Sequence, residues 1–406
     1  MGQRIVNTEL SLRTRRTGRD RLVALLLVAF GLLCTLSRGA SAEEDPEIKL
    51  GRESAAENDK QVKLITDKDL LERVNKIGSQ IAAVANEIEV PVQWGLPGLK
   101  KLPYTFKIVD DKDVNAYSMP GGFIYINRGL LDFTKSDDEL AGVIAHEVAH
   151  AAHHHMMKLI AEQDKIQWAA LGPALVSILL GKGGSETTSN LLLAGQLYTI
   201  AKMNGYGVEA EKDADHAAVY LLMKTPYNPV GLLTFIERLA RQERLKPEVE
   251  LGIYRTHPPT LERAQALIRQ LTELGIPINR REVDPTLGAR VEMVTTDGGV
   301  YADVVMNGTR IVRLADNGTT GAEERAKTVA KMVNSLFDDN LLAFDLSLSS
   351  DKTRVLARRR TLIALTDADA RASGLTVQQV AQNALDALRN LLWQDQFNRT
   401  PLTSAS

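Results

Sequence analysis

The 406-residue sequence has one cysteine, Cys34, so a disulfide framework in the rest of the chain is excluded. It also lacks a strong charge of either sign, because 49 lysines and arginines face 51 aspartates and glutamates. The charges are uneven along the chain. Residues 1–42 carry seven arginines and two carboxylates, a net of +5, which leaves −7 for residues 43–406. This mildly acidic remainder lacks the basic footprint of a nucleic-acid-binding protein, so we exclude nucleic acid as a partner.

The first 42 residues have the pattern of an export signal. Five arginines precede an apolar run, Leu22–Leu36, which at 15 residues is shorter than the roughly 20 needed to span a bilayer. The sequence Ala-Ser-Ala at 40–42 has the form of a signal-peptidase site. We therefore predict that residues 1–42 are a cleaved signal peptide and that the mature protein works in the periplasm or cell envelope. A signal anchor in the inner membrane is the alternative, since the basic region is long.

The full sequence has the composition of a globular protein, with 44% apolar and 25% charged residues. Apolar periodicity predicts helices over residues 46–88, 137–157, 208–223, 230–243 and 261–274. Tyr104–Val109 and Phe123–Tyr125 are strand-like and flank a turn at Pro120-Gly121-Gly122. Residues 166–181 and 191–201 are apolar but too short for spans, so we expect buried or membrane-touching helices there.

The pattern changes after a boundary at Pro277–Pro285. Strands are predicted over residues 291–294, 300–305, 311–314, 344–348 and 354–365, with Asn307-Gly308 as a hairpin turn. Helices are predicted to Phe337, opened by a capping box at Thr320–Glu323, and from a capping Thr376 to about Gln394. The chain is thus predicted to be α+β, with one domain at 43–278 and a small accessory α+β domain at 286–406 that has no catalytic constellation.

All seven histidines lie between His146 and His257, a clustering that indicates a site. His146-Glu147-Val148-Ala149-His150 is the HExxH pattern, and residues four apart on a helix face the same way. One Zn²⁺ can take a nitrogen from each histidine, while Glu147 lies close enough to act on a water molecule without being a ligand. The surrounding residues are apolar, and burying these groups without a metal would be costly. A zinc site is therefore favoured over a solvated polar stripe.

A catalytic zinc normally has three protein ligands. The metzincin pattern needs glycine and histidine where His153 and Met156 stand, so that source is excluded. Glu211 and Asp215 lie four residues apart on a predicted helix, so one can bind the metal while the other supports a ligand histidine. Glu209 is a less favoured ligand, and a solvated acidic stripe is the alternative reading of this stretch.

Several motifs in this order resemble peptidase family M48, a family of zinc endopeptidases, over about residues 46–275. They are Leu50–Glu53, Asn115–Gly122, Arg128–Leu131, Asp138–Ala141, the HExxH pattern, Glu211-x-x-Ala214-Asp215, and Thr256–Pro259 with Arg263. The resemblance implies a mostly helical zincin domain of the gluzincin type with a small edge-stranded sheet, followed by an extra domain as in periplasmic members. It implies His146, His150 and Glu211 as ligands of one Zn²⁺ per chain, Glu147 as catalytic base and Asp215 as the support of a ligand histidine.

The same resemblance implies how a peptide is held. It places the loop of His257 over the metal and Arg263 beside the ligands, so both are candidate donors to the oxyanion of the reaction. His257 could instead occupy the open metal position as an inhibitory latch. Met119–Asn127 resembles an edge strand that pairs with substrate backbone. Its neighbourhood makes Asn115, Pro120, Gly121 and Gly122 candidate substrate-binding residues.

The expected substrates are polypeptides, namely unfolded or misassembled cell-envelope proteins. Residues 166–201 or the C-terminal domain could dock on a membrane surface or an envelope complex, and Arg358-Arg359-Arg360 is either such a patch or a solvated strand end. A chaperone-like holdase or assembly factor that uses the same groove is the alternative function. Of the other histidines, His155 matches a recurrent family position, His153 is expected beside the site or on the surface, and His216 on an exposed helix face.

Overall fold

A computed structural model describes residues 44–163, 207–245, 252, 253, 257, 261–339 and 341–398. The predicted signal peptide and the apolar segments at 166–181 and 191–201 lie outside these residues. No helix within the described ranges combines the length and apolar character needed to cross a bilayer. The structure is α+β, as predicted: it is mostly helical, with small three-stranded sheets.

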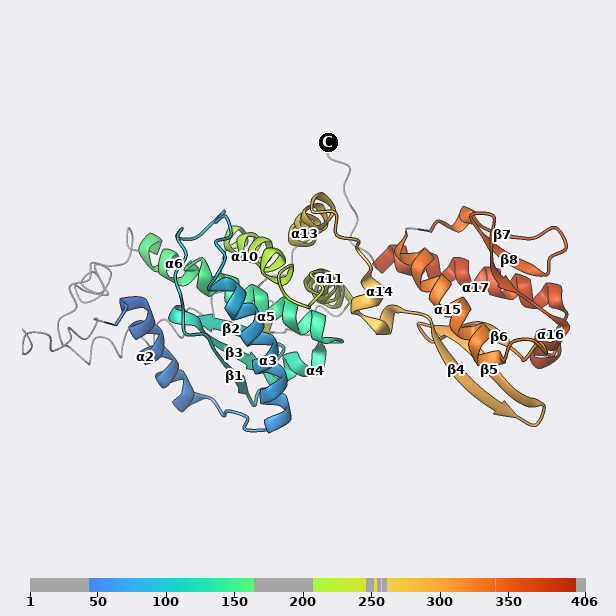
Figure 1. Cartoon of the computed structure of the whole chain (residues 1–406), viewed down its shortest axis with the longest axis horizontal. Helices are drawn as coiled ribbons and strands as arrows, with labels where there is room; N and C mark the ends of the chain where they lie inside the picture. Colours follow the sequence, from blue (N-terminus) through green and yellow to red (C-terminus); the bar gives the residue numbers. More distant parts are fainter. Residues whose placement is uncertain are drawn as a thin grey trace, which may run out of the picture. The chain divides into compact units, whose positions relative to one another are not determined.

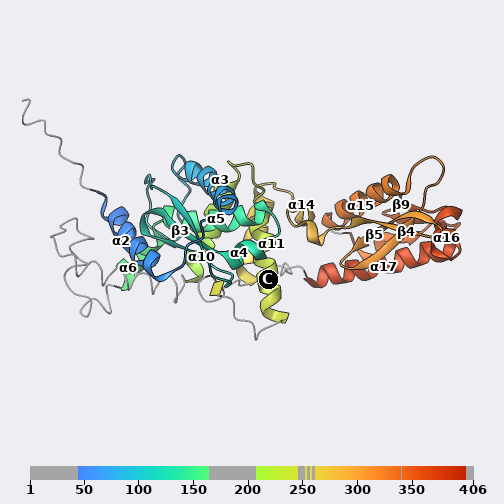
Figure 2. The same cartoon turned by 90° about the horizontal axis from the view of Figure 1, so that it is seen from below.

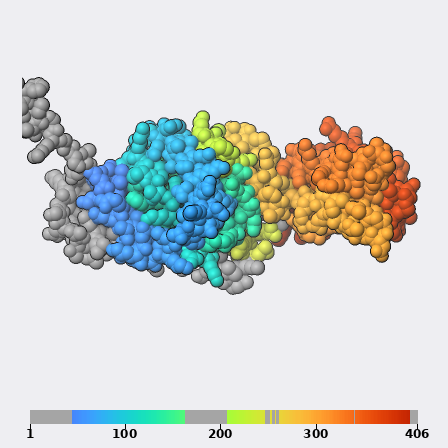
Figure 3. All heavy atoms as spheres, turned by 60° about the horizontal axis from the view of Figure 1, so that its bottom comes forward, coloured from blue at the N-terminus to red at the C-terminus, as the bar shows by residue number. Residues whose placement is uncertain are grey.

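Two helices begin the described chain, in the region predicted to be helical. Helix α2 spans Pro46–Gln61 and helix α3 spans Lys68–Ala85 (Figures 1 and 2). Asp67 caps α3, because its side chain accepts a hydrogen bond from the backbone N–H of Leu70. Figure 3 shows the segments coloured blue to cyan, which include both helices, packed closely on one face.

The first sheet consists of β1 (Thr105–Val109), β2 (Ala116–Met119) and β3 (Phe123–Asn127) in the order β1-β3-β2. Strand β1 is parallel to β3, and β2 is antiparallel to it. The prediction that Met119–Asn127 contains an edge strand is wrong, because β3 is paired on both sides. The edge beside α5 belongs to β2, which the sequence pattern missed. All four residues of β2 are buried, so the strand lacks the alternation that marks a half-exposed one.

Helix α5, Asp137–Ala152, carries the HExxH pattern through the centre of this part of the molecule. Ser136 caps it by accepting from the N–H of Glu139, and three carboxylates lie in its first turn, where the helix dipole favours them. Figure 1 shows α5 between the sheet and helix α10 (Val208–Leu222), and it also packs on α3 and on α11 (Val230–Leu245). Gly142 of α5 and Gly231 of α11 allow a close approach: a Cβ at Gly142 would lie 2.7 Å from the backbone N of Leu232.

The predicted single helix over 137–157 is interrupted. Helix α5 ends at Ala152, His154 has a left-handed φ of 54°, and α6 begins at His155 and runs to Gln163. Tertiary contacts explain the break. His154 Nδ1 lies 2.9 Å from a carboxylate oxygen of Glu47, and the carbonyl of His153 accepts from the N–H of Leu96. A continuous helix would point these groups elsewhere.

The remaining helices of this part are α4 (Arg128–Phe133), α13 (Leu261–Glu273) and α14 (Arg280–Val283). One cluster of buried apolar side chains joins α3, the sheet, α5, α10, α11 and α13. The HExxH helix is therefore held on several sides by a packed core, which fixes the directions of its polar side chains.

The C-terminal part has a separate apolar core, drawn from residues 289–392. Strands β4 (Arg290–Thr296), β5 (Gly299–Met306) and β6 (Thr309–Leu314) form one antiparallel sheet. Strands β7 (Leu346–Leu348), β8 (Arg354–Ala357) and β9 (Arg360–Ala364) form another. Helices α15 (Ala322–Asp338) and α17 (Val377–Asn398) lie on opposite sides of the strands in Figure 2, and the short α16 (Asp367–Ser373) precedes α17.

Three local predictions for this part can be judged. The hairpin at Asn307-Gly308 is confirmed, with φ of 50° and 75°. The capping box at Thr320 is wrong: Gly321 is the N-cap and makes no side-chain bond, because the side chain of Asn317 orders the preceding turn. The single strand over 354–365 is also wrong, since it is two strands joined by a turn at Arg358-Arg359. Both arginines have positive φ, so the first two residues of the arginine run form the turn, and Arg360 begins β9.

Candidate metal centre

Helix α5 brings His146, Glu147 and His150 into the interior. All three side chains are buried. The Nε2 atoms of His146 and His150 lie 3.0 Å apart, so the two rings present the same nitrogen to one point, as their spacing on a helix predicts. The HExxH residues thus form one side of a compact site.

Helix α10 supplies the carboxylates from the opposite side. Glu211 has one oxygen 3.2 Å from Nε2 of His146 and the other 3.5 Å from Nε2 of His150. Asp215 instead lies behind His146, with Oδ1 2.9 Å from its Nδ1. Glu209 points outward and contacts Lys212 on the surface. Of the carboxylates weighed from the sequence, only Glu211 therefore faces the nitrogens that could bind a metal.

His257 and Arg263 complete the group. His257 Nδ1 lies 3.3 Å from Nε2 of His146 and 3.1 Å from an oxygen of Glu211, while its Nε2 lies 3.4 Å from Glu147. Arg263 is buried rather than on the surface. Its Nε and Nη2 donate to Asp215 at 2.7 and 2.8 Å, and its Nη1 lies 2.9 Å from Glu211. Arg263 thus holds both carboxylates of α10 in place.

Burial and neighbouring charges shift the pKa values of the site's histidines and carboxylates in opposite directions. Burial alone disfavours a charged imidazole, but hydrogen bonds and charge from Asp215 and Glu211 raise the pKa of His146 to about 9. Burial lowers the pKa of His150 well below its usual value. Burial opposes ionisation of Glu211, yet the surrounding positive charges hold the pKa of Glu211 well below its usual range. His150 is therefore neutral and Glu211 ionised, the protonation states in which these side chains bind a cation.

The donor set fits Zn²⁺, which favours histidine nitrogen and carboxylate oxygen. Ligand atoms of His146, His150, Glu211 and His257 all lie within 4.8 Å of one another. Oε2 of Glu147 is buried without a hydrogen-bond partner among the described residues. A buried carboxylate oxygen of this kind needs a donor, and a water molecule in the site would supply it.

The four predicted substrate-binding residues flank strand β2. Asn115 precedes the strand and is buried, as are Pro120, Gly121 and Gly122 after it. The Pro-Gly-Gly turn packs under α2 so closely that a Cβ at Gly51 would lie 1.8 Å from the carbonyl oxygen of Pro120. Just before β2 begins, the N–H of Ile253 donates to the carbonyl of Val114, and the N–H of Gly252 donates to the side chain of Asp113. Gly252 and Ile253 therefore lie beside the residues that lead into the edge strand.

An apolar pocket adjoins the site. His146, Glu147, His257 and Arg263 line it together with Val143, Ile253 and four side chains of α11: Leu232, Phe235, Ile236 and Leu239. The sequence pattern predicted α11 as a helix but gave no reason to place its apolar face beside the metal ligands.

The sequence did not predict that three consecutive histidines behind the site are all buried. His153, His154 and His155 are all buried, and His153 and His155 share the carboxylate of Asp213. His216 is half-buried rather than exposed. The local signal that could have drawn attention to His155 is its match to a recurrent family position, whereas nothing local singles out Asp213.

The sequence profile of peptidase family M48 matches residues 73–270, which include every element of this site except α2. The chain carries a peptidase family M48 domain. A second profile, a domain of unknown function called DUF8459, matches residues 303–394.

Named relatives agree with the M48 assignment. The chain is 27% identical to the beta-barrel assembly-enhancing protease of Yersinia pestis over 229 residues, 55% of this chain and 43% of the relative. It is 26% identical to metalloprotease LoiP of Escherichia coli K12 over 262 residues, 63% of this chain and 99% of LoiP. It is 26% identical to the mitochondrial metalloendopeptidase OMA1 of Schizosaccharomyces pombe over 179 residues, 44% and 50% of the two chains.

The chain spans less than half the length of the assembly-enhancing proteases it matches. The M48 domain and the names of these relatives support a metalloendopeptidase, and the family implies a metal, generally zinc. The buried His/Glu group is compatible with that metal.

Proposed function

We propose that the protein is a zinc-dependent endopeptidase that cleaves unfolded or misassembled proteins of the cell envelope. The observation that carries the proposal is the convergence of His146 Nε2, His150 Nε2 and the Glu211 carboxylate beside Oε2 of Glu147, which has no hydrogen-bond partner among the residues the structure describes. Three protein ligands and a neighbouring carboxylate that can accept a proton are the minimal set of a hydrolytic zinc site.

When bound, zinc lowers the pKa of a water molecule and polarises the scissile carbonyl. Glu147 accepts the proton of the attacking water and passes it to the leaving amine, the general acid–base role of a carboxylate placed beside the ligand group. Asp215 lies 2.9 Å from Nδ1 of His146, on the side of the ring away from the ligand group, so Nε2 is directed at the ligands. Arg263 orients Asp215 and Glu211 through its contacts with both carboxylates.

We assign the binding of substrate backbone to the edge of β2, Ala116–Met119, in place of the edge strand predicted within Met119–Asn127. Pairing along this edge would run beside α5, and Asn115 and Pro120–Gly122 bracket it. Strand addition reads backbone more than side chains, so it accepts extended polypeptides of many sequences. The N–H of Ile253 donates to the carbonyl of Val114, two residues before this edge begins.

Export to the envelope rests on the N-terminal sequence pattern and on the name of the assembly-enhancing relatives. A protease in that compartment meets outer-membrane proteins before they are assembled, while they are extended. Docking through residues 166–201 or the C-terminal domain, and the domain boundaries 43–278 and 286–406, stay predictions.

The proposal is tested by cleavage of casein, an unfolded protein, by the purified chain. Cleavage should occur with one zinc per chain, stop when a chelator removes the metal, and return when Zn²⁺ is restored. Cleavage that persists in the chelator would contradict a zinc enzyme. Tight binding of casein without cleavage by the zinc-loaded protein would favour the holdase instead.

A further inference from the structure

Behind His150, on the side away from the ligand group, lies a second buried cluster. Nδ1 of His150 is 2.8 Å from Nδ1 of His155, and Nε2 of His155 is 2.9 Å from Oδ2 of Asp213. His155 and Asp213 are both fully buried. The three side chains form a continuous row of hydrogen-bonding groups that ends on the proposed zinc ligand.

Asp213, at the far end of the row, is held in place by backbone N–H groups. Oδ1 of Asp213 accepts from the N–H groups of Gln93 and Trp94, so this oxygen has two fixed donors. The ring of Trp94 packs edge-on against His155, with centroids 5.3 Å apart. Oδ2 of Asp213 is thereby directed at His153 and His155. A carboxylate that accepts from two backbone N–H groups is favoured in its ionised form, which can only accept hydrogen bonds.

The direction of every hydrogen bond follows from this acceptor. Because Asp213 can only accept, His155 must carry a proton on Nε2. His155 is fully buried, which disfavours a charged imidazole, and a neutral ring that donates from Nε2 accepts at Nδ1. His150 must then donate from Nδ1, which leaves the lone pair of His150 on Nε2. That nitrogen is the one that faces His146 and Glu211.

We propose that Asp213 and His155 are positioning residues that select the metal-binding tautomer of His150. The inference rests on the proposed zinc site, but the row of hydrogen bonds exists in the metal-free chain. Asp215 lies 2.9 Å from Nδ1 of His146, so each helical histidine has its own carboxylate: Asp215 directly and Asp213 through one imidazole. Support of this kind typically changes metal affinity by about 10–100-fold.

Asp213→Asn is the discriminating variant. The two backbone N–H donors of Gln93 and Trp94 require an oxygen, so the new amide must turn its NH₂ toward His155. His155 would then accept at Nε2 and carry its proton on Nδ1. His150 would have to accept at Nδ1 and carry its proton on Nε2, where the metal binds. The substitution therefore reverses both tautomers while it preserves the size of the side chain.

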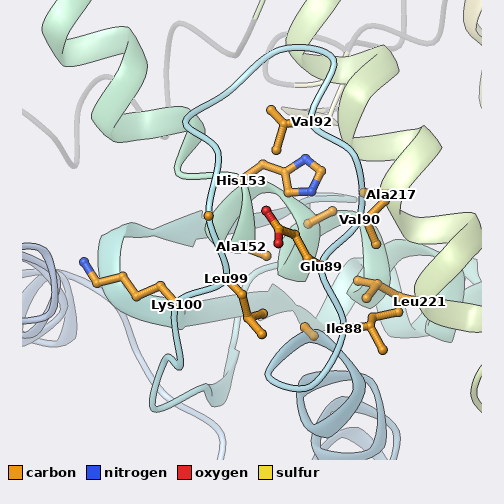
Figure 4. Close-up of a pocket in the computed structure, with 13 residues that line it drawn as sticks. Ile88, Glu89, Val90, Val92, Leu99, Lys100, Ala152, His153, Ala217 and Leu221 are labelled. Carbon is orange, nitrogen blue, oxygen red and sulfur yellow. The ribbon is translucent and has the colours of Figure 1, made fainter.

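His153→Gln is the matched control. His153 also bonds Oδ2 of Asp213, but it lies off the row, at the end of α5 beside the loop of Val90 and Val92 (Figure 4). Its replacement removes one bond from the same carboxylate and the edge-on ring contact with His155, whose centroid lies 5.9 Å away, but it leaves the bonds of His155 to Asp213 and His150 in place. Thermal unfolding of the zinc-free proteins reports any general loss of structure in either variant.

The experiment measures histidine tautomers by two-bond ¹H–¹⁵N correlation spectra of the zinc-free protein, and zinc affinity by competition with a chelator. Wild type and His153→Gln should show His150 protonated on Nδ1 and His155 on Nε2. Asp213→Asn should show both tautomers reversed and an affinity about 10–100-fold lower.

Two results would overturn the proposal: a zinc-free wild type in which His150 is protonated on Nε2, or an Asp213→Asn variant with unchanged tautomers and affinity. Two zinc ions per wild-type chain, one of them lost in Asp213→Asn, would show that His153, His155 and Asp213 bind a metal of their own. Failure of casein cleavage with the predicted tautomers intact would reject the proposed function and leave the row of hydrogen bonds standing.

Discussion

Replacing Glu211 by glutamine tests the choice of the third zinc ligand. The change keeps the shape of a side chain that is wholly buried and removes its charge. Two consequences follow from the contacts. The proposed metal loses its only anionic ligand, and Arg263 loses an ionised partner at 2.9 Å.

The expected magnitudes can be worked from these contacts. Loss of a residue that merely supports a ligand costs about 10–100-fold in metal affinity, so loss of a ligand should cost more than about 100-fold. A hydrogen bond to a charged group is worth about 1.5–3 kcal/mol, and Arg263 keeps its two bonds to Asp215. We therefore expect the zinc-free Glu211→Gln protein to be less stable by about 1.5–3 kcal/mol and still folded.

Glu209→Gln is the matched control, since the same change is made two residues away on the same helix. Glu209 is exposed and its contact with Lys212 spans 3.4 Å on the surface, so its loss should cost less than about 1 kcal/mol. The assay is zinc content and chelator competition, with urea unfolding of the zinc-free proteins. Equal zinc affinity in the two variants would refute the ligand assignment.

Three further predictions use the same protein. If His257 is a latch, His257→Ala should raise the initial rate of casein cleavage at saturating zinc. A fall of roughly 10²-fold with unchanged zinc content would instead identify an oxyanion donor. Arg263→Met should destabilise the zinc-free protein by about 3–5 kcal/mol, because it leaves two buried carboxylates unpaired, and a change below 1 kcal/mol in urea unfolding would contradict this. Mass spectrometry of the exported protein should find Glu43 as its first residue, whereas retention of residues 1–42 would indicate the signal anchor.

The spacing of residues in the sequence was enough to predict those features of the site that depend on a single helix. The shared face of His146 and His150 follows from their spacing, and the structure brings the two Nε2 atoms together. The meeting of α5 with α10 is a tertiary fact. Residue spacing made Glu209 the less favoured ligand, but Glu211 could be preferred to Asp215 only through the family resemblance. The structure supplies the physical reason, since Glu211 faces α5 and Glu209 faces solvent.

The errors arose where distant residues decide local structure. The helix break at His154 depends on Glu47, which lies 107 residues away in the sequence. Strand β2 is too short and too buried to show a period, and its place at the sheet edge depends on pairing with β3. Asp213 looked like one of several acidic residues on a helix, and its role emerges only from the backbone N–H groups of a remote loop.

The central claim is that this site hydrolyses peptide bonds with Glu147 as the base. The most direct test compares casein cleavage by wild type and Glu147→Gln after zinc analysis of the same preparations. The account predicts equal zinc content and a cleavage rate lower by about 10²-fold or more, because the amide leaves the ligands in place but cannot accept a proton. Cleavage at the wild-type rate by the zinc-loaded variant would contradict it.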